Sequence, residues 1–315
     1  MPYIISMKTI SLTLTPQEIA GLSSKTKSWS RREDIQYTQF QVKNSEVTIT
    51  VYNSGKVVFA GDNAEFYAAS FTKQKLPEIK AVSKESNPSQ SALSAQLIGK
   101  PMAGSDEVGT GDYFGPVVVC AAIIDQEDYK ILPIDQIMDT KQMNDIKVRE
   151  LGPFLQKHLK HSLLILDNPK YNRVHQTQNL NVIKTKLHNQ AFVNLAKRYD
   201  MPQHVIIDQF LRKESYFKHL ASDKEVYRDL IFETKAENKF LAVACGAIIA
   251  RYAFLDYFDK LEEKYQMVFP KGGGKQVTPA ILEFVDRYGE DQLYKVAKLH
   301  FINTENAIGH PLDLV

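Results

Sequence analysis

Alternating apolar and polar positions predict short β-strands in the first 76 residues. The alternation is cleanest over residues 46–52, where Val47, Ile49 and Val51 share one face of a strand and the intervening threonines share the other. Small polar residues at 53–55 then predict a hairpin turn. Strands are expected near residues 8–14, 36–43, 46–52 and 56–60.

Helix signals frame these strands. Thr15 supplies a hydroxyl N-cap, Pro16 occupies the first helical position and Glu18 the third, which together form a capping box. A second helix is expected after the last strand, over about residues 62–75. This order indicates a small α+β domain over residues 1–76, whose exposed sheet face is either solvated or docks a nucleic-acid groove.

The composition changes after this domain. Residues 77–98 are polar, rich in serine and interrupted by prolines, which predicts a flexible linker. A tether of this kind lets one domain hold a substrate and raises the substrate concentration near the other.

Residues 99–315 interleave apolar runs with helical patterns, which indicates a second domain of mixed α/β architecture. The segment 240–251 is apolar on all sides, so a central buried helix is expected there. Strands are expected near residues 102–107, 116–124, 161–167, 203–208 and 229–233, and helices near 144–159, 181–199, 238–264 and 278–290.

The bulk composition narrows the class of protein. The chain has 315 residues, 43% of them hydrophobic and 24% charged, with a net charge of +2, which is typical of a soluble globular protein without a large basic tail. Cys120 and Cys245 lie among small apolar residues and form no CxxC motif, so buried reduced thiols are expected. Without a basic leader or a run of 18 apolar residues, a cytoplasmic protein with no membrane span is expected.

Candidate chemistry lies at the ends of apolar elements. Asp106 and Glu107 end the first strand of the second domain, Asp208 ends a later strand, and Glu237 precedes the apolar helix. Clustered carboxylates repel one another and need a hard divalent cation, for which oxygen-only ligands indicate Mg²⁺ or Mn²⁺. Two such ions can stabilise the attacking and leaving oxygens of a phosphodiester displacement.

A structural role is the alternative for each acid, since a strand-end carboxylate more often caps a helix or pairs with a cation. Adjacent strand residues also face opposite sides, so Asp106 and Glu107 cannot both reach one ion from regular strand geometry unless the following turn adds twist. The glycines of that turn, residues 109–111, either satisfy a positive φ or let bare backbone approach a sugar 2′-hydroxyl, the group that separates RNA from DNA.

Other candidates carry weaker signals. Lys141 precedes a helix and is a candidate phosphate contact, as are the two lysines of the glycine-rich segment 271–275, which is otherwise a mobile loop. His300 is either a substrate contact or a structural histidine. The sequence contains no Walker A motif, no Gly-x-Ser-x-Gly and no Cys/His pairs at zinc spacing.

The run from Asp106 to Pro116 closely resembles the signature of the type 2 ribonucleases H, and specifically of the ribonuclease HIII branch. The similarity covers residues 99–310, and the order of elements over 1–76 is similar to the TATA-binding-protein-like domain that ribonucleases HIII carry. Further phrases that resemble the family are Asp139-Thr140-Lys141-Gln142, Asn179-Leu180-Asn181, Leu187-His188-Asn189-Gln190-Ala191, the segment 242–251 and Ala297-Lys298-Leu299-His300-Phe301.

This resemblance implies an RNase H-like fold and a metal-dependent endonuclease that cleaves the RNA strand of RNA/DNA hybrids, leaving 5′-phosphate and 3′-hydroxyl ends. Asp106, Glu107 and Asp208 match the family's first three acids, which implies that they are metal ligands, and Glu237 matches the fourth catalytic acid. Glutamate at the fourth position is typical of the HIII branch.

The substrate contacts implied by the resemblance are the backbone of Gly109, Thr110 and Gly111, reading 2′-hydroxyls, with Lys141 near a phosphate. Thr110 stands where ribonucleases HII usually have arginine, which supports the HIII branch and argues against strong cleavage at a single embedded ribonucleotide. A monomer acting on an RNA/DNA hybrid is expected. The alternative function is a non-catalytic nucleic-acid-binding module with the same fold.

Overall fold

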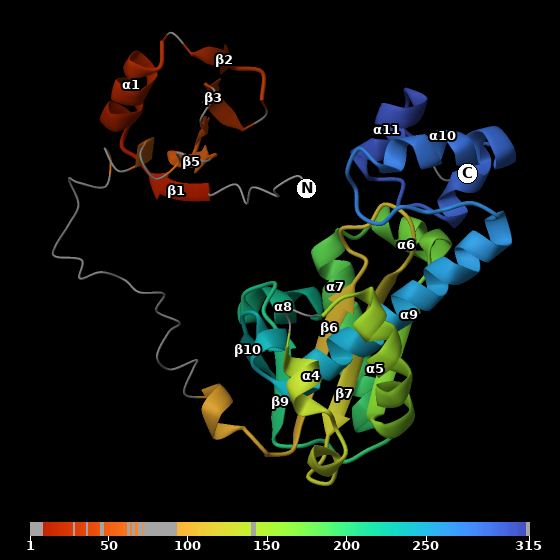
Figure 1. Ribbon diagram of the computed structural model, residues 1–315. Helices are drawn as coiled ribbons and strands as arrows, with labels where there is room; N and C mark the ends of the chain where they lie inside the picture. Colours follow the sequence, from red (N-terminus) through yellow and green to blue (C-terminus); the bar gives the residue numbers. More distant parts are fainter. Residues whose placement is uncertain are drawn as a thin grey trace. The chain divides into compact units, whose positions relative to one another are not determined.

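A computed structural model shows that the chain divides into two units, Met1–Glu85 and Ser86–Val315 (Figure 1). Each unit encloses a hydrophobic core of its own. The structure describes residues 9–312 except for 28, 36, 45–46, 62–63, 65–66, 69–70, 72–92 and 140–142.

The first unit is built on an antiparallel sheet with the strand order β1-β5-β4-β3-β2. The predicted capping box is confirmed, because Thr15 Oγ1 accepts from the Glu18 amide at 3.3 Å and Glu18 Oε2 accepts from the Thr15 amide at 2.7 Å. The elements are β1 (Thr9–Thr13), α1 (Pro16–Lys25), β2 (Ser30–Arg32), β3 (Thr38–Lys43), β4 (Thr48–Tyr52) and β5 (Lys56–Ala60).

The predicted alternation decides which face of this sheet is buried. Val47, Ile49 and Val51 are buried in the core of the unit, and the turn at 53–55 joins β4 to β5 with Gly55 at φ 80°. The short strand β2 was missed because its three residues are all exposed and show no alternation. Of the second helix predicted over 62–75, residues 64, 67, 68 and 71 are helical and the rest lie outside the described residues.

The predicted linker over 77–98 lies mostly outside the described residues. Its last residues belong to the second unit, since 93–96 are helical and Leu97, only 2% exposed, packs in the core of that unit. The folded part of the second unit therefore begins before residue 99.

The second unit is built on a mixed sheet with the strand order β10-β9-β6-β7-β8. The first three strands in this order run parallel, and β7 and β8 are antiparallel to their neighbours. This confirms the predicted mixed-sheet α/β class. The strands are β6 (Met102–Val108), β7 (Val117–Ile124), β8 (Lys160–Leu166), β9 (His204–Asp208) and β10 (Ile231–Glu233).

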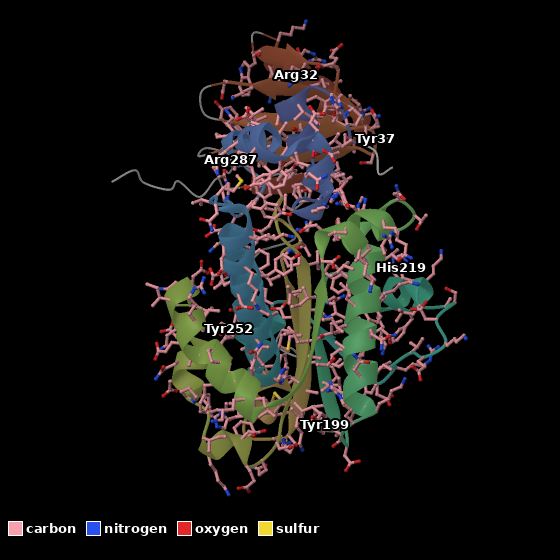
Figure 2. All side chains as sticks on the ribbon, turned by 90° about the vertical axis from the view of Figure 1, so that its right-hand side faces the viewer. Arg32, Tyr37, Tyr199, His219, Tyr252 and Arg287 are labelled. Atoms are coloured by element: carbon pink, nitrogen blue, oxygen red, sulfur yellow. The ribbon has the colours of Figure 1, made fainter. Side chains whose placement is uncertain are left out.

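Helices cover both faces of this sheet (Figure 2). One face packs against α9 and α5, and the other against α7 and α8, so β7 is buried on both of its faces. The edge strand β8 stays partly exposed, with Ile165 45% exposed. The helices are α4 (Ile134–Met138), α5 (Asp145–His158), α6 (Asn168–His175), α7 (Leu180–Ala196), α8 (Lys213–His219), α9 (Leu241–Tyr265), α10 (Val277–Tyr288) and α11 (Ile302–Ile308), with 3₁₀ turns η1 (Asp128–Lys130), η2 (Ala236–Asn238) and η3 (Glu290–Lys295). Helices α4, α6, α8 and α11 were not predicted, because they are too short to show a period.

Helix α9 is the predicted central helix. By length and composition it could cross a membrane, but 72% of its most apolar window is buried inside the protein, as in a core helix. Gly104 of β6 lets it approach the sheet, because a Cβ there would lie 2.5 Å from the Val243 side chain. Cys120 and Cys245 are free and buried at this same face, as predicted.

Candidate active site

Asp106 and Glu107 lie on the central strand β6 and point to opposite faces of the sheet. The strand keeps regular antiparallel register here, with Asp106 opposite Cys120 and Glu107 opposite Val119. Glu107 shares its face with Ser105, and both contact the same histidine of α7. The register shows no shift along β6, and the twist that the sequence suggested was expected in the turn after it.

Asp106 lies on the α9 face, where two other predicted acids approach it. The parallel register of β6 and β9 pairs Ser105 with Ile207, so Asp208 follows beside Asp106. Burial, followed by the charges of Glu107, Asp208 and Glu237, raises the pKa of Asp106 well above its usual range. The fold therefore brings these four carboxylates within electrostatic reach of one another.

Glu107 lies between two cationic or polar side chains of α7. Its Oε1 pairs with Lys184 Nζ, and its Oε2 lies 2.8 Å from His188 Nε2. Burial alone would raise the pKa of Glu107, but the hydrogen bonds and charges of His188 and Lys184 hold it at about 2. Lys184 was not singled out in the sequence, and His188 was quoted only as part of a family phrase without a predicted role, although their spacing of four residues on one helix places them on one face.

Asp208 and Glu237 are positioned by the segment that leads into α9. Asp208 Oδ1 accepts a hydrogen bond from the Ala236 amide at 2.9 Å, and Glu237 Oε1 accepts from Asn238 Nδ2 at 2.6 Å. Lys235 enters this turn at φ 53°, in the left-handed region. These contacts bring the start of α9 to the end of β9.

Glu233 is a further acid that sequence reasoning missed. It lies opposite Asp208 in the β9–β10 register, is only 6% exposed, and pairs with Lys239 at 3.3 Å. The strand that it ends was predicted near residues 229–233, but Glu233 itself was not singled out among the candidate acids.

The glycines of the turn after β6 differ in what they require. At Gly109, φ is +90° and a Cβ would lie 2.1 Å from the Pro116 carbonyl oxygen, so only glycine fits. At Gly111 a Cβ would meet nothing within 4 Å. Packing therefore explains why residue 109 is a glycine. It does not explain the glycine at 111, where a side chain would have room.

A buried lysine donates hydrogen bonds to the backbone of this turn. Lys298 Nζ donates to the carbonyl oxygens of Asp112 at 2.8 Å and Gly115 at 2.5 Å, and Asn168 Nδ2 also donates to Gly115 at 2.9 Å. Burial lowers the pKa of Lys298 to about 7, against the opposing charge of Asp112. Lys298 was quoted as part of a family phrase but was not predicted to have a role.

The glycine-rich segment 271–275 lies against the same turn. Asp112 Oδ1 accepts from the Gly272 amide at 2.6 Å, and the Tyr113 amide donates to the Gly272 carbonyl at 2.9 Å. Lys271 pairs with Asp145. Two glycine-rich segments far apart in sequence therefore form one surface.

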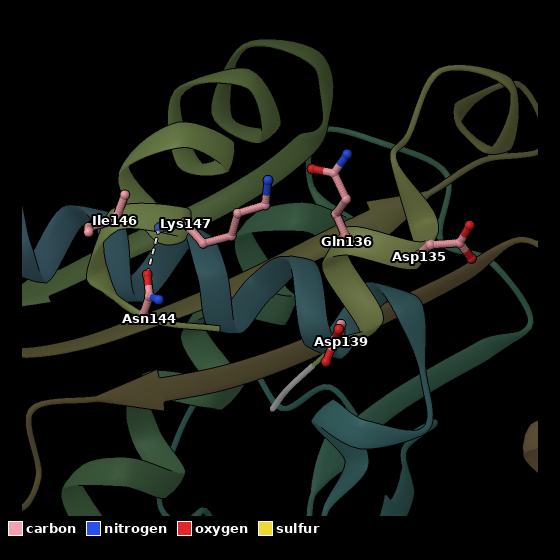
Figure 3. Close-up of a pocket in the computed structure, with 6 residues that line it drawn as sticks. All are labelled: Asp135, Gln136, Asp139, Asn144, Ile146 and Lys147. Carbon is pink, nitrogen blue, oxygen red and sulfur yellow. Dashed lines mark hydrogen bonds between the residues drawn. The ribbon is translucent and has the colours of Figure 1, made fainter. Parts of the chain in front are cut away.

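Of the two weaker candidates, the structure describes only His300. Lys141 lies outside the described residues, and its neighbour Asp139 lines a separate cavity of about 450 Å³ (Figure 3). His300 stacks on His175 with ring centroids 3.9 Å apart, and burial, then the charges of His175 and Lys298, lower its pKa to about 4. This environment favours the structural interpretation of His300. The cavity in Figure 3 is lined by Asp135, Gln136, Asp139, Asn144, Ile146 and Lys147.

The carboxylates fit a hard divalent cation. Across the part of the chain that the structure describes, no three His, Cys, Asp or Glu side chains already form a compact metal-binding group. The contacts of Glu107 with Lys184 and His188 give a physical reason, because they hold it on the α7 face. Burial, followed by the charges of three other carboxylates, nevertheless disfavours the ionised form of Asp106, and a bound cation would relieve this cost.

Comparison with known proteins gives consistent matches. Residues 103–304 match the family described as Ribonuclease HII, and residues 9–84 match a domain of unknown function, DUF3378. The chain is 39% identical over 273 residues to ribonuclease HIII of Listeria monocytogenes serovar 1/2a, covering 85% of this chain and 88% of that protein. It is also 39% identical to ribonuclease HIII of Bacillus mycoides over 272 residues, covering 85% and 87%.

Solved structures agree with the fold. The crystal structure of Bst-RNase HIII in complex with Mn²⁺ is 34% identical, with a TM-score of 0.67, and covers 96% of this chain and 98% of that one. Aquifex aeolicus RNase H3, at 23% identity and a TM-score of 0.52 over 93% of this chain and 100% of that one, shares the fold.

Proposed function

Because the chain belongs to the ribonuclease HII family and, within it, to the ribonucleases HIII, we propose that it cleaves the RNA strand of RNA/DNA hybrids internally, leaving 5′-phosphate and 3′-hydroxyl ends. It is a ribonuclease H by relationship. The observation that carries the proposal is the approach of Asp208 and Glu237 to Asp106 on the α9 face, with Glu107 next to Asp106 on the strand and the turn that follows β6 beside them.

Mg²⁺ or Mn²⁺ is the proposed cofactor, with Asp106, Glu107 and Asp208 as its ligands and Glu237 as the fourth catalytic acid. When bound, such a cation activates water and neutralises charge on the scissile phosphate. Asp106 and Asp208 present oxygens side by side from neighbouring parallel strands. The Ala236 amide fixes one oxygen of Asp208, which leaves the other available for a ligand.

The turn at 109–111 supports a role in recognising RNA. Gly111 is exposed, and no packing requirement accounts for its lack of a side chain. A sugar can therefore approach the backbone at Gly111, whose N–H and C=O groups match the donor and acceptor of a 2′-hydroxyl. Thr110 is half-buried and Gly109 is buried, so of the three residues proposed to read the sugar Gly109 is the least accessible. Lys298 and Asn168 hold the far end of the turn in place.

We further propose that the first unit binds the hybrid and that the chain acts as a cytoplasmic monomer away from membranes. The proposed division is a substrate-binding domain over 1–76, a flexible linker after it, and a catalytic domain that includes residues 93–97 at the end of the segment 77–98 as well as 99–315. The first unit supports this role with a five-stranded antiparallel sheet of its own.

Cleavage mapping tests the proposed function. The full chain is incubated with a long RNA/DNA hybrid in Mg²⁺ or Mn²⁺, and the ends of the RNA products are labelled. Internal cuts with 5′-phosphate ends support the proposal, and a DNA duplex with one ribonucleotide should be cut far less well. Cleavage that survives a chelator, or no cleavage of the hybrid with either metal, contradicts it. In the second case the non-catalytic module becomes the better explanation.

A further inference from the structure

We infer that Lys184 is an exchangeable counter-cation for Glu107, which a divalent metal must displace, whereas His188 is a fixed positioning residue for the same carboxylate. This inference rests on the proposed function only in taking Glu107 as a metal ligand. It adds that the Lys184 ammonium competes with the metal for the Glu107 carboxylate.

Both oxygens of Glu107 are engaged by the protein. Oε1 pairs with Lys184 Nζ and Oε2 lies 2.8 Å from His188 Nε2, and the paired side chains of Lys184 and Glu107 are only 11% and 12% exposed. A carboxylate in this state is neutralised without a metal. To share a cation with Asp106, on the other face of β6, Glu107 has to release at least one partner.

His188 is the partner that stays. Its ring has no solvent exposure, and its Nδ1 lies 2.8 Å from Ser105 Oγ, so both ring nitrogens have fixed partners. Ser105, His188 and Glu107 are the residue types of a hydrolytic triad, but Ser105 is fully buried and unreachable by a substrate. The chain of contacts instead orients the imidazole, and through it Glu107 Oε2.

Lys184 is the partner that can leave. Its ammonium ends a flexible four-carbon stem, and it lies 3.9 Å from the centroid of the Phe210 ring. That ring face stabilises the cation independently of Glu107. Lys184 can therefore give up the carboxylate without becoming an isolated buried charge.

The two residues consequently have opposite effects on metal affinity. Replacing Lys184 by a neutral side chain removes a cation that competes for Glu107 and increases the negative charge near Asp106, so divalent cations should bind more tightly. Replacing His188 removes the contact that orients Glu107, so divalent cations should bind more weakly. If Lys184 had a purely structural role, its replacement would not increase the affinity for divalent cations.

Calorimetric titration of the full-length protein with Mn²⁺ alone, without nucleic acid, tests this inference. Lys184→Met should lower the Kd for Mn²⁺ by about fivefold or more. His188→Gln and His188→Phe should each raise the Kd for Mn²⁺. The glutamine variant tests the positioning role if the phenylalanine ring disturbs packing. Lys186→Met is the matched control, because Lys186 lies on the same helix and pairs with Asp223 at 2.9 Å. Asp106→Asn identifies the binding heat as that of this site.

Thermal unfolding provides a second readout. Lys184→Met leaves Glu107 without its cation, so its melting temperature should fall in chelator and recover in Mn²⁺ by more than that of wild type. An unchanged or weakened Mn²⁺ affinity in Lys184→Met overturns the exchange, and unchanged affinity in both His188 variants overturns the positioning role. Hybrid cleavage by the wild type, measured separately, reports on the proposed function itself.

Discussion

Asp106 and Glu107 are neighbours on β6 whose side chains lie on opposite faces of the sheet, and the Glu107 amide donates a 2.8 Å hydrogen bond to Asp106 Oδ1. One carboxylate therefore joins Asp208 beside α9, and the other joins Lys184 and His188 on α7. The pair connects the two layers of the second unit at the point where chemistry is proposed.

Asp106→Asn should abolish cleavage of a hybrid while binding survives, because it removes a metal-binding oxygen and little volume. The loss should exceed the ~100-fold that removal of an outer partner of a metal ligand costs. The variant should also be more stable than wild type in chelator, since burial and three nearby carboxylates disfavour the ionised aspartate. Single-turnover cleavage, hybrid binding in Ca²⁺ and thermal unfolding check this. Full activity in the variant would exclude Asp106 from the site.

Two glycine substitutions separate packing from recognition in the turn after β6. Gly109→Ala should destabilise the protein by about 2 kcal/mol or more, since an L-residue is forced into φ +90° and against Pro116. Gly111→Ala should leave the denaturation midpoint unchanged but lower the rate of hybrid cleavage, because its new methyl group points into open space. Equal effects of both variants on stability would remove the distinction.

Lys298 should make stability depend on pH. Its pKa is about 7 in the folded protein, below the ~10.4 of an unfolded lysine, so the unfolded chain binds more protons between these values. The free energy of unfolding should therefore rise from pH 7 to pH 10, by more than about 1 kcal/mol from this group. Denaturation midpoints should show a flatter rise for Lys298→Met, whereas Lys295→Met should keep the wild-type slope.

Removal of residues 1–76 should weaken hybrid binding by at least about tenfold and lower turnover at saturating substrate much less. The second unit has its own core, so the shortened chain should fold. Affinity measured at several salt concentrations should fall as salt rises, because phosphate contacts release counterions. If affinity for the hybrid does not change, the first unit has no binding role.

The sequence predicted most of the secondary structure because alternation and apolar runs are local signals. The burial of Val47, Ile49 and Val51 and the capping box at Thr15 followed directly from such patterns. It also named the carboxylates that the fold brings around Asp106. It predicted the strand that ends at Glu233 but did not single out this acid, because its place opposite Asp208 depends on the pairing of two strands.

What the sequence by itself determined is therefore the set of elements, the family and the chemical groups at the strand ends. Only the tertiary structure decided how they are distributed, because pairing across the sheet and helix packing depend on contacts between distant residues. The β6–β9 register places Asp208 beside Asp106. The packing of α7 against the sheet brings Lys184 and His188 into contact with Glu107. Alternation along one strand separated the two acids, and no local pattern could show which partners each would find.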